Sequence, residues 1–90
     1  MEFKITDRAK KKLALMKEQN IPIVLYGIPV GWNRYNYKIV SVKQKKDDKV
    51  YNVDGIEIIV TAEVDRTLLG AKIDFGGFFT KDYIVTPRYS

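Results

Sequence analysis

Cysteine and histidine are both absent from this chain of 90 residues. Without cysteine there is no disulfide, no thiolate nucleophile and no thiolate-ligated zinc or iron–sulfur site, and without histidine the commonest general base and imidazole ligand are missing. The remaining hydroxyl and carboxylate groups form no nucleophile motif and no carboxylate pair with separable roles. We therefore expect no catalytic residue and no enzymatic activity.

Long apolar segments are also lacking. The longest uncharged run covers residues 19–33, and its apolar part, residues 21–32, is interrupted by Pro22, Gly27 and Pro29, whereas a membrane-spanning helix needs about 20 apolar residues. Residues 1–5 carry no signal-peptide pattern, and the lysine-rich segment that follows lacks the bulky apolar face of a membrane-surface helix. We expect a cytoplasmic protein that does not contact membranes.

The residues that are present describe one small domain over residues 1–90. Hydrophobic residues make up 46% of the chain and charged residues 30%, which supports a single core but leaves a domain of this length little stability in reserve. The net charge of +5 permits attraction to nucleic acid, to an anionic membrane surface or to an acidic protein partner.

An amphipathic helix is expected near the N-terminus. Thr6 or Asp7 supplies an oxygen for the N-cap, and Ala9, Leu13 and Met16 recur on one face at helical spacing. The opposite faces are rich in lysine, so we expect the helix to lie on a core with its charged faces in solvent.

Short strands are expected from residue 23 onward. The pattern predicts a strand over Ile23–Tyr26, a loop rich in glycine and proline over Gly27–Asn33, and an alternating strand over Tyr35–Ile39. Asp54-Gly55 between two apolar runs predicts a hairpin, because such a turn needs positive φ angles.

The last third of the chain is expected to contain a helical turn and two strands. The apolar spacing predicts the turn near residues 64–69, closed by Gly70 as a C-terminal cap. Strands are expected over Ala71–Phe75 and Tyr83–Thr86, with a break at Gly76-Gly77 between them.

The stretch from Val53 to Phe75, VDGIEIIVTAEVDRTLLGAKIDF, joins a hairpin, an apolar strand, a helical turn ending at glycine and an x-I-D-F strand. Together with I-T-D-x-A-x-x-x-L at residues 5–13, it resembles the HesB/IscA-like domain of the A-type iron–sulfur carrier family. The resemblance implies a mainly β fold (α+β by content). In such a fold a small β-sandwich or barrel of short, largely antiparallel strands carries one N-terminal amphipathic helix and a short helical turn.

The resemblance also indicates which ligands this chain lacks. The family holds iron or a cluster with one Cys in the loop after the early strand and a Cys-x-Cys pair near the C-terminus. Trp32 falls at or beside the place of the first Cys, and the sequence ends at Ser90 without the segment that carries the pair. Clusters are held chiefly by Cys thiolates, with His as the usual substitute, so we expect no iron–sulfur cluster and no other cofactor.

A carboxylate metal site is the remaining metal option. Asp47-Asp48, Asp74 and Asp82 are the acidic residues that such a site would use, but no spacing among them matches a calcium loop. A solvated, charge-balanced surface explains them better, and we expect no metal site.

Trp32, Asn33, Arg34 and Tyr35 are the candidate residues for binding a protein partner. Trp, Tyr and Arg are enriched at binding hot spots. The alternative is that Trp32 covers the open end of a small β core and that Tyr35 points inward with Tyr37, and for Trp32 the pattern favours this packing role. Arg34 is less easily buried and is the better candidate for a contact.

Lys43, Lys45 and Lys46 are the candidate residues for binding an anion. The alternative is a solvated, solubilising surface, which we favour because no RNA- or DNA-binding motif accompanies the lysines.

The sequence therefore predicts a non-catalytic protein-interaction or accessory module, monomeric or homodimeric, that does not hold a cluster itself. The alternative function is a small basic domain that binds nucleic acid or another anionic ligand.

Overall fold

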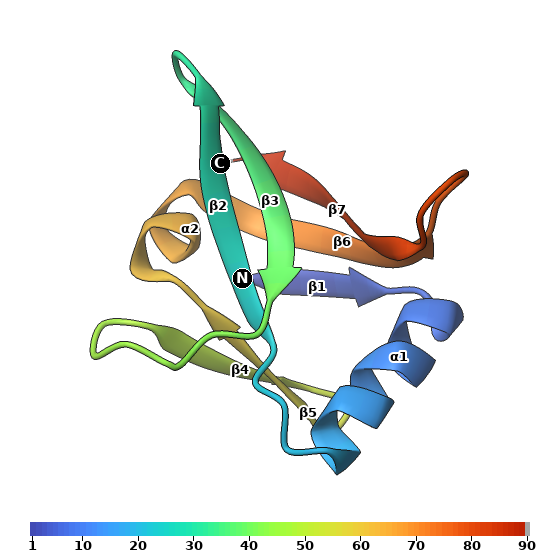
Figure 1. Cartoon of the computed structure of the whole chain (residues 1–90). Coiled ribbons are helices and arrows are strands. Elements are labelled where there is room, and N and C mark those ends of the chain that lie inside the picture. The colour runs from blue at the N-terminus through green and yellow to red at the C-terminus, as the bar shows by residue number, and fades with distance from the viewer. Residues whose placement is uncertain (90) are drawn as a thin grey trace.

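The computed structural model describes residues 1–89, which form seven strands and two helices (Figure 1). The strands build two sheets, with the orders β1–β6–β7 and β3–β2–β5–β4. In chain order the elements are β1 (Glu2–Ile5), α1 (Asp7–Glu18), β2 (Val24–Gly31), β3 (Arg34–Val40), β4 (Lys49–Val53), β5 (Ile56–Val60), α2 (Ala62–Thr67), β6 (Leu68–Gly76) and β7 (Asp82–Tyr89).

The mainly β class with one N-terminal helix is confirmed. The β2–β3, β4–β5 and β6–β7 pairs are antiparallel, whereas β1 pairs with β6 and β2 pairs with β5 in parallel. Over the described residues the two sheets do not close into a barrel. Of the two architectures that the sequence predicted, the barrel is therefore wrong. Tyr37 of β3 and Tyr89 of β7 bring the sheets together, with their ring centroids 6.2 Å apart.

Helix α1 begins and packs as its sequence predicts. The Thr6 hydroxyl oxygen accepts a hydrogen bond from the Ala9 N–H at 3.3 Å and caps the helix. Ala9 and Leu13 are completely buried, and Met16 packs against the same cluster from the next turn. This single apolar face fixes the helix on the two sheets.

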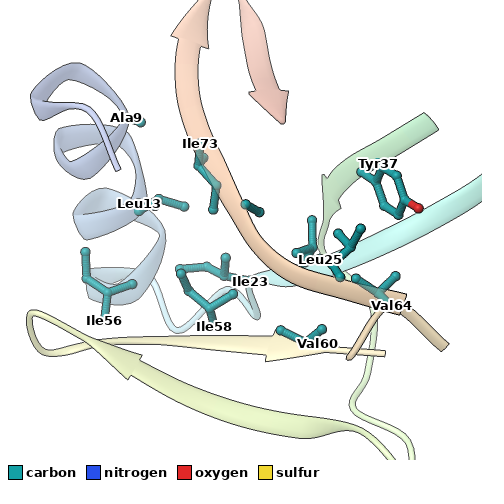
Figure 2. Close-up of a cluster of buried hydrophobic side chains, with 12 residues drawn as sticks. Ala9, Leu13, Ile23, Leu25, Tyr37, Ile56, Ile58, Val60, Val64 and Ile73 are labelled. Carbon is teal, nitrogen blue, oxygen red and sulfur yellow. The ribbon is translucent and has the colours of Figure 1, made fainter. Parts of the chain in front are cut away.

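The core lies between α1 and the facing sides of both sheets. Figure 2 shows Leu13 of the helix opposite Ile73 of β6, with Ile23 and Ile58 beside them. Aliphatic side chains fill the center of this cluster, which burial of apolar surface stabilises. The largest side chains that are fully buried are Leu13, Val24, Leu25, Ile58, Val60 and Ile73.

Strand β1 was not expected from the sequence. Its four residues alternate between exposed and half-buried positions, but so short an alternation does not predict a strand by itself. The strand forms because β6 offers a free edge: Phe3 pairs with Ala71 and Ile5 with Ile73.

The predicted helical turn is displaced, and the expected cap at Gly70 is wrong. Helix α2 covers Ala62–Thr67, and Leu68 is already extended at the start of β6. Gly70 lies inside this strand, where a Cβ atom would approach the backbone oxygen of Glu2 to 2.6 Å. Glycine is therefore needed here for the close approach of β1, and the Leu-Leu pair that suggests a helix packs as strand instead.

Candidate functional site

The segment that was expected to be a loop over Gly27–Asn33 is mostly strand. Strand β2 continues to Gly31 and pairs with β3, which leaves a turn at Trp32 and Asn33. Asn33 has φ 57°, a left-handed conformation that Asn tolerates better than most residues. The register shifts between Pro29 and Gly31, and the tip of the β2–β3 hairpin extends beyond the rest of the molecule (Figure 1).

Trp32 lies at this tip with 93% of its surface exposed. The packing role that the sequence favoured for Trp32 is therefore wrong. Arg34 and Asn33 are exposed beside it, so three of the four candidate partner-binding residues share the end of one hairpin.

Tyr35 and Tyr37 lie further down the same face of β3. Tyr35 is 44% exposed, and its ring centroid is 6.3 Å from that of the buried Tyr37. Burial, together with hydrogen bonding to Tyr89, raises the pKa of Tyr37 to about 12. Tyr37 is therefore a neutral, packed side chain, and Tyr35 connects this packed ring to the solvent-exposed part of the hairpin.

A groove of about 590 Å³ begins at Tyr35. Residues of β2, β3 and α2 and of the segment before β4 line it. The lining residues are Tyr26, Gly27, Tyr35, Tyr37, Lys45, Lys46, Asp47, Asp48, Thr61, Ala62, Glu63, Val64, Arg66 and Thr67. The structure thus brings one predicted partner-binding residue, Tyr35, next to two predicted anion-binding residues, Lys45 and Lys46.

Sequence reasoning missed one cationic and one aromatic residue that line this groove. Arg66 projects from α2, and Tyr26 lies on β2. No spacing in the chain connects them with Lys45, because they approach only through the parallel pairing of β2 with β5 and the short helix after β5. Lys43, which was predicted together with the other two lysines, does not line the groove.

The charges of the groove are mixed. Lys45, Lys46 and Arg66 take part in none of the ion pairs found within residues 1–89. Three acidic residues also line the groove, and one of them, Asp48, accepts a hydrogen bond from the Lys45 N–H at 2.8 Å and so fixes the local turn. The groove therefore combines aromatic walls with unpaired cations and acidic neighbours.

The acidic residues do not gather into a metal site in the part of the chain that the structure describes: no group of three or more potential ligands occurs there. Asp74, one of the carboxylates considered above, is occupied by other partners. Its Oδ1 accepts hydrogen bonds from the Thr6 hydroxyl and from Arg8 Nε, each at 2.7 Å, and its Oδ2 accepts one from Arg8 Nη2 at 2.7 Å.

Neither α1 nor α2 is long and apolar enough to cross a membrane, and they are the only helices over residues 1–89.

No protein-family model and no curated protein sequence matches the chain. Among solved structures, the fold is similar to Escherichia coli SufA, which is involved in the biosynthesis of iron–sulfur clusters. The TM-score is 0.74 at 18% identity, over 93% of this chain and 78% of SufA.

Two further structures are similar at comparable identity. IscA, whose structure contains a [2Fe-2S] cluster, gives a TM-score of 0.70 at 17% identity over 96% of this chain and 82% of IscA. An Aquifex aeolicus protein whose structure was solved by NMR gives 0.64 at 22% identity over 98% and 91% of the two chains. The protein therefore has the HesB-like fold of the A-type iron–sulfur carriers, in a sequence without cysteine.

Proposed function

We propose that this protein is a non-catalytic, cytoplasmic protein-binding module that has the fold of a cluster carrier and does not hold a cluster itself. The observation that carries the proposal is the exposure of Trp32 at the tip of the β2–β3 hairpin. The resemblance places a cluster-ligating Cys of the family at or beside this position, so an aromatic contact surface replaces a thiolate.

The chemistry of the available side chains supports the proposal that the protein does not hold a cluster. Iron–sulfur clusters need soft thiolate ligands, for which imidazole is the usual substitute, and the sequence has neither. Carboxylates are hard ligands and do not replace thiolates in such clusters. Any cluster chemistry would therefore require a second protein that supplies the ligands.

The geometry of the hairpin supports the proposal that the protein binds a protein partner. Trp, Arg and Tyr are the residue types that contribute most to protein–protein hot spots, and the exposed Trp32, Arg34 and Tyr35 lie within one hairpin. The ladder between β2 and β3 holds the tip in place, so little conformational entropy is lost when a partner binds. The free protein is a monomer or homodimer in this proposal, and the partner is a different protein.

Capture of a partner with matched variants tests the proposal. The wild-type protein, Trp32→Ser and Val42→Ser are immobilised and exposed to extract from the source cells, and the captured protein is then purified. Val42 is 47% exposed and lies outside the hairpin, so Val42→Ser is the control. Binding of the purified partner is measured by calorimetry.

We expect Trp32→Ser to weaken binding by about thirtyfold, which corresponds to a hot-spot loss of about 2 kcal/mol. Val42→Ser should bind like the wild type. Equal affinities of all three proteins, or the absence of any partner that distinguishes them, would contradict the proposed role of the hairpin.

A second candidate function is the binding of an anionic ligand in the groove. One observation favours it: Lys45, Lys46 and Arg66 line the same groove as the exposed rings of Tyr26 and Tyr35. Aromatic rings and cations together are the usual components of sites for single-stranded nucleic acid. The three acidic residues in the groove oppose this function, and we rank it second for that reason.

The position of Lys43 gives this second function a sharp test. Charge reversal in Lys45→Glu/Lys46→Glu should abolish retention on heparin if the groove binds anions, whereas Lys43→Glu should change it little beyond the loss of net charge. Equal effects for each reversed charge would show that retention comes from the overall charge of +5, and the groove would then have no role in it.

A further inference from the structure

The loop between β6 and β7 presents two adjacent phenylalanines to solvent. Phe78 is 100% exposed and Phe79 is 99% exposed, although Phe is among the residue types that are most often buried. Their ring centroids are 5.9 Å apart. Neither ring contributes to the core of the domain, so their presence in the loop is not explained by folding.

The backbone of this loop holds the two rings outward. Gly77 has φ 144°, and a Cβ atom at this position would lie 2.1 Å from the backbone oxygen of Thr80. The chain therefore folds back between Gly77 and Thr80, with Phe78 and Phe79 at the bend. Below the loop, Phe75 and Tyr83 pair across the strands with their ring centroids 5.1 Å apart, which anchors the base of the hairpin.

Cations surround the base of the loop. Lys12 of α1 lies with its Nζ 5.2 Å from the ring centroid of Phe75, and the Arg8 guanidinium lies beside Gly76. Lys81 follows the loop and is exposed. Acidic groups are also present: Asp74 is neutralised by Arg8, and Asp82 begins β7, so the cations remain in excess in a chain of net charge +5.

We propose that the β6–β7 loop binds the surface of an anionic lipid bilayer, with Phe78 and Phe79 inserted among the headgroups and Lys12 and Lys81 facing the phosphates. A bilayer fits these observations better than a protein pocket. Hot spots between proteins are surrounded by further contacts that exclude water. Arg34 and Tyr35 offer such neighbours to Trp32, whereas only glycines, Thr80 and Lys81 flank Phe78 and Phe79. A bilayer accommodates projecting apolar groups without a complementary surface, and cations add attraction to anionic lipids.

This inference differs from the expectation that the protein does not contact membranes. That expectation rested on the lack of a long apolar run, on the lack of a signal-peptide pattern and on the lysine-rich helix, whose apolar face packs on the core. The loop at residues 77–81 is a separate feature, for which the sequence predicts only a break at Gly76-Gly77.

Sedimentation with lipid vesicles tests the proposal. The full chain is mixed with vesicles of phosphatidylcholine alone or of equal parts phosphatidylcholine and phosphatidylglycerol. Wild type is compared with Phe78→Ser/Phe79→Ser and with Trp32→Ser, which removes the other exposed aromatic tip. Thermal unfolding of each protein is recorded, and it should be unchanged because the altered side chains are almost fully exposed.

We expect wild type and Trp32→Ser to sediment with the anionic vesicles, and the double variant to partition at least about tenfold less. Lys12→Glu/Lys81→Glu should also reduce binding. In a Trp32→Phe/Phe79→Trp protein, the emission of the new tryptophan should shift to shorter wavelength when anionic vesicles are added.

Three results would overturn the proposal: no sedimentation of the wild type, equal loss in Trp32→Ser and the double variant, or no shift in the emission of the new tryptophan. Loss of a protein partner in the double variant, without binding to vesicles, would assign the loop to a protein pocket instead. Because the proposal uses a different hairpin from the one that contains Trp32, it stands or fails independently of the proposed function.

Discussion

At the scale of the residue, Asp74 connects the start of α1 to β6. Arg8 and the Thr6 hydroxyl donate to its carboxylate, and the Phe75 N–H donates to the same Oδ1 at 2.8 Å. These donors hold the pKa of Asp74 well below its ordinary value, with the hydrogen bond from Arg8 as the largest cause. The Thr6 side chain therefore has two roles: it caps α1, and it also links α1 to β6 through Asp74.

The depressed pKa of Asp74 predicts a dependence of stability on pH. The ionised carboxylate stabilises the folded state above the unfolded pKa of about 4, and this contribution is lost as the pH falls toward the folded value. We expect Asp74→Asn to be less stable than wild type at neutral pH, and the difference in unfolding free energy to shrink steadily below about pH 4. Urea unfolding of both proteins at a series of pH values measures this difference in unfolding free energy. A difference that stays constant with pH would contradict the stabilising role of the ion pair between Arg8 and Asp74.

At the scale of the element, α1 and the β4–β5 hairpin are where local signals and packing agree. The hairpin turns at Asp54 and Gly55 with φ 52° and 83°, as the Asp-Gly pair predicts. The β2–β3 and β1–β6 pairings have no such local signal. The length of β2 depends on β3 beside it, and β1 exists only because β6 offers an edge.

Helix α1 offers a matched pair of substitutions. Leu13 is completely buried between α1 and the two sheets, whereas Leu15 is 50% exposed on the same helix. Leu13→Ala should lower the free energy of unfolding by about 2–5 kcal/mol because it leaves a cavity. Leu15→Ala should change it by less than about 0.5 kcal/mol. Denaturant unfolding of both variants measures the contrast, and similar losses would show that the helix packs differently.

The candidate site was the least predictable part of the molecule. Trp32 is exposed because β2 extends past Pro29 and carries the tip away from the core, and neither the composition nor the spacing of the segment indicates how far a strand extends. The groove joins Lys45 to Arg66 through tertiary structure alone. Residue type correctly marked Arg34 as a solvent-exposed group, because guanidinium groups are seldom buried.

At the scale of the whole molecule, fold and ligand chemistry are separate. The two-sheet architecture needs only apolar alternation, a helix with one buried face and turns of the right chirality, and the sequence supplies all of these. Iron–sulfur clusters are held chiefly by Cys thiolates, and the sequence supplies none. The similarity to SufA and IscA in fold therefore coexists with a sequence that contains no cysteine.

Anaerobic reconstitution of the 90-residue chain with iron and sulfide, followed by desalting, tests the central claim most directly. A cysteine-containing A-type carrier treated in parallel is the positive control. We predict that the carrier retains a visible absorption band and bound iron, whereas this protein retains neither. A stable band that survives desalting, with iron in stoichiometric amount, would contradict the account.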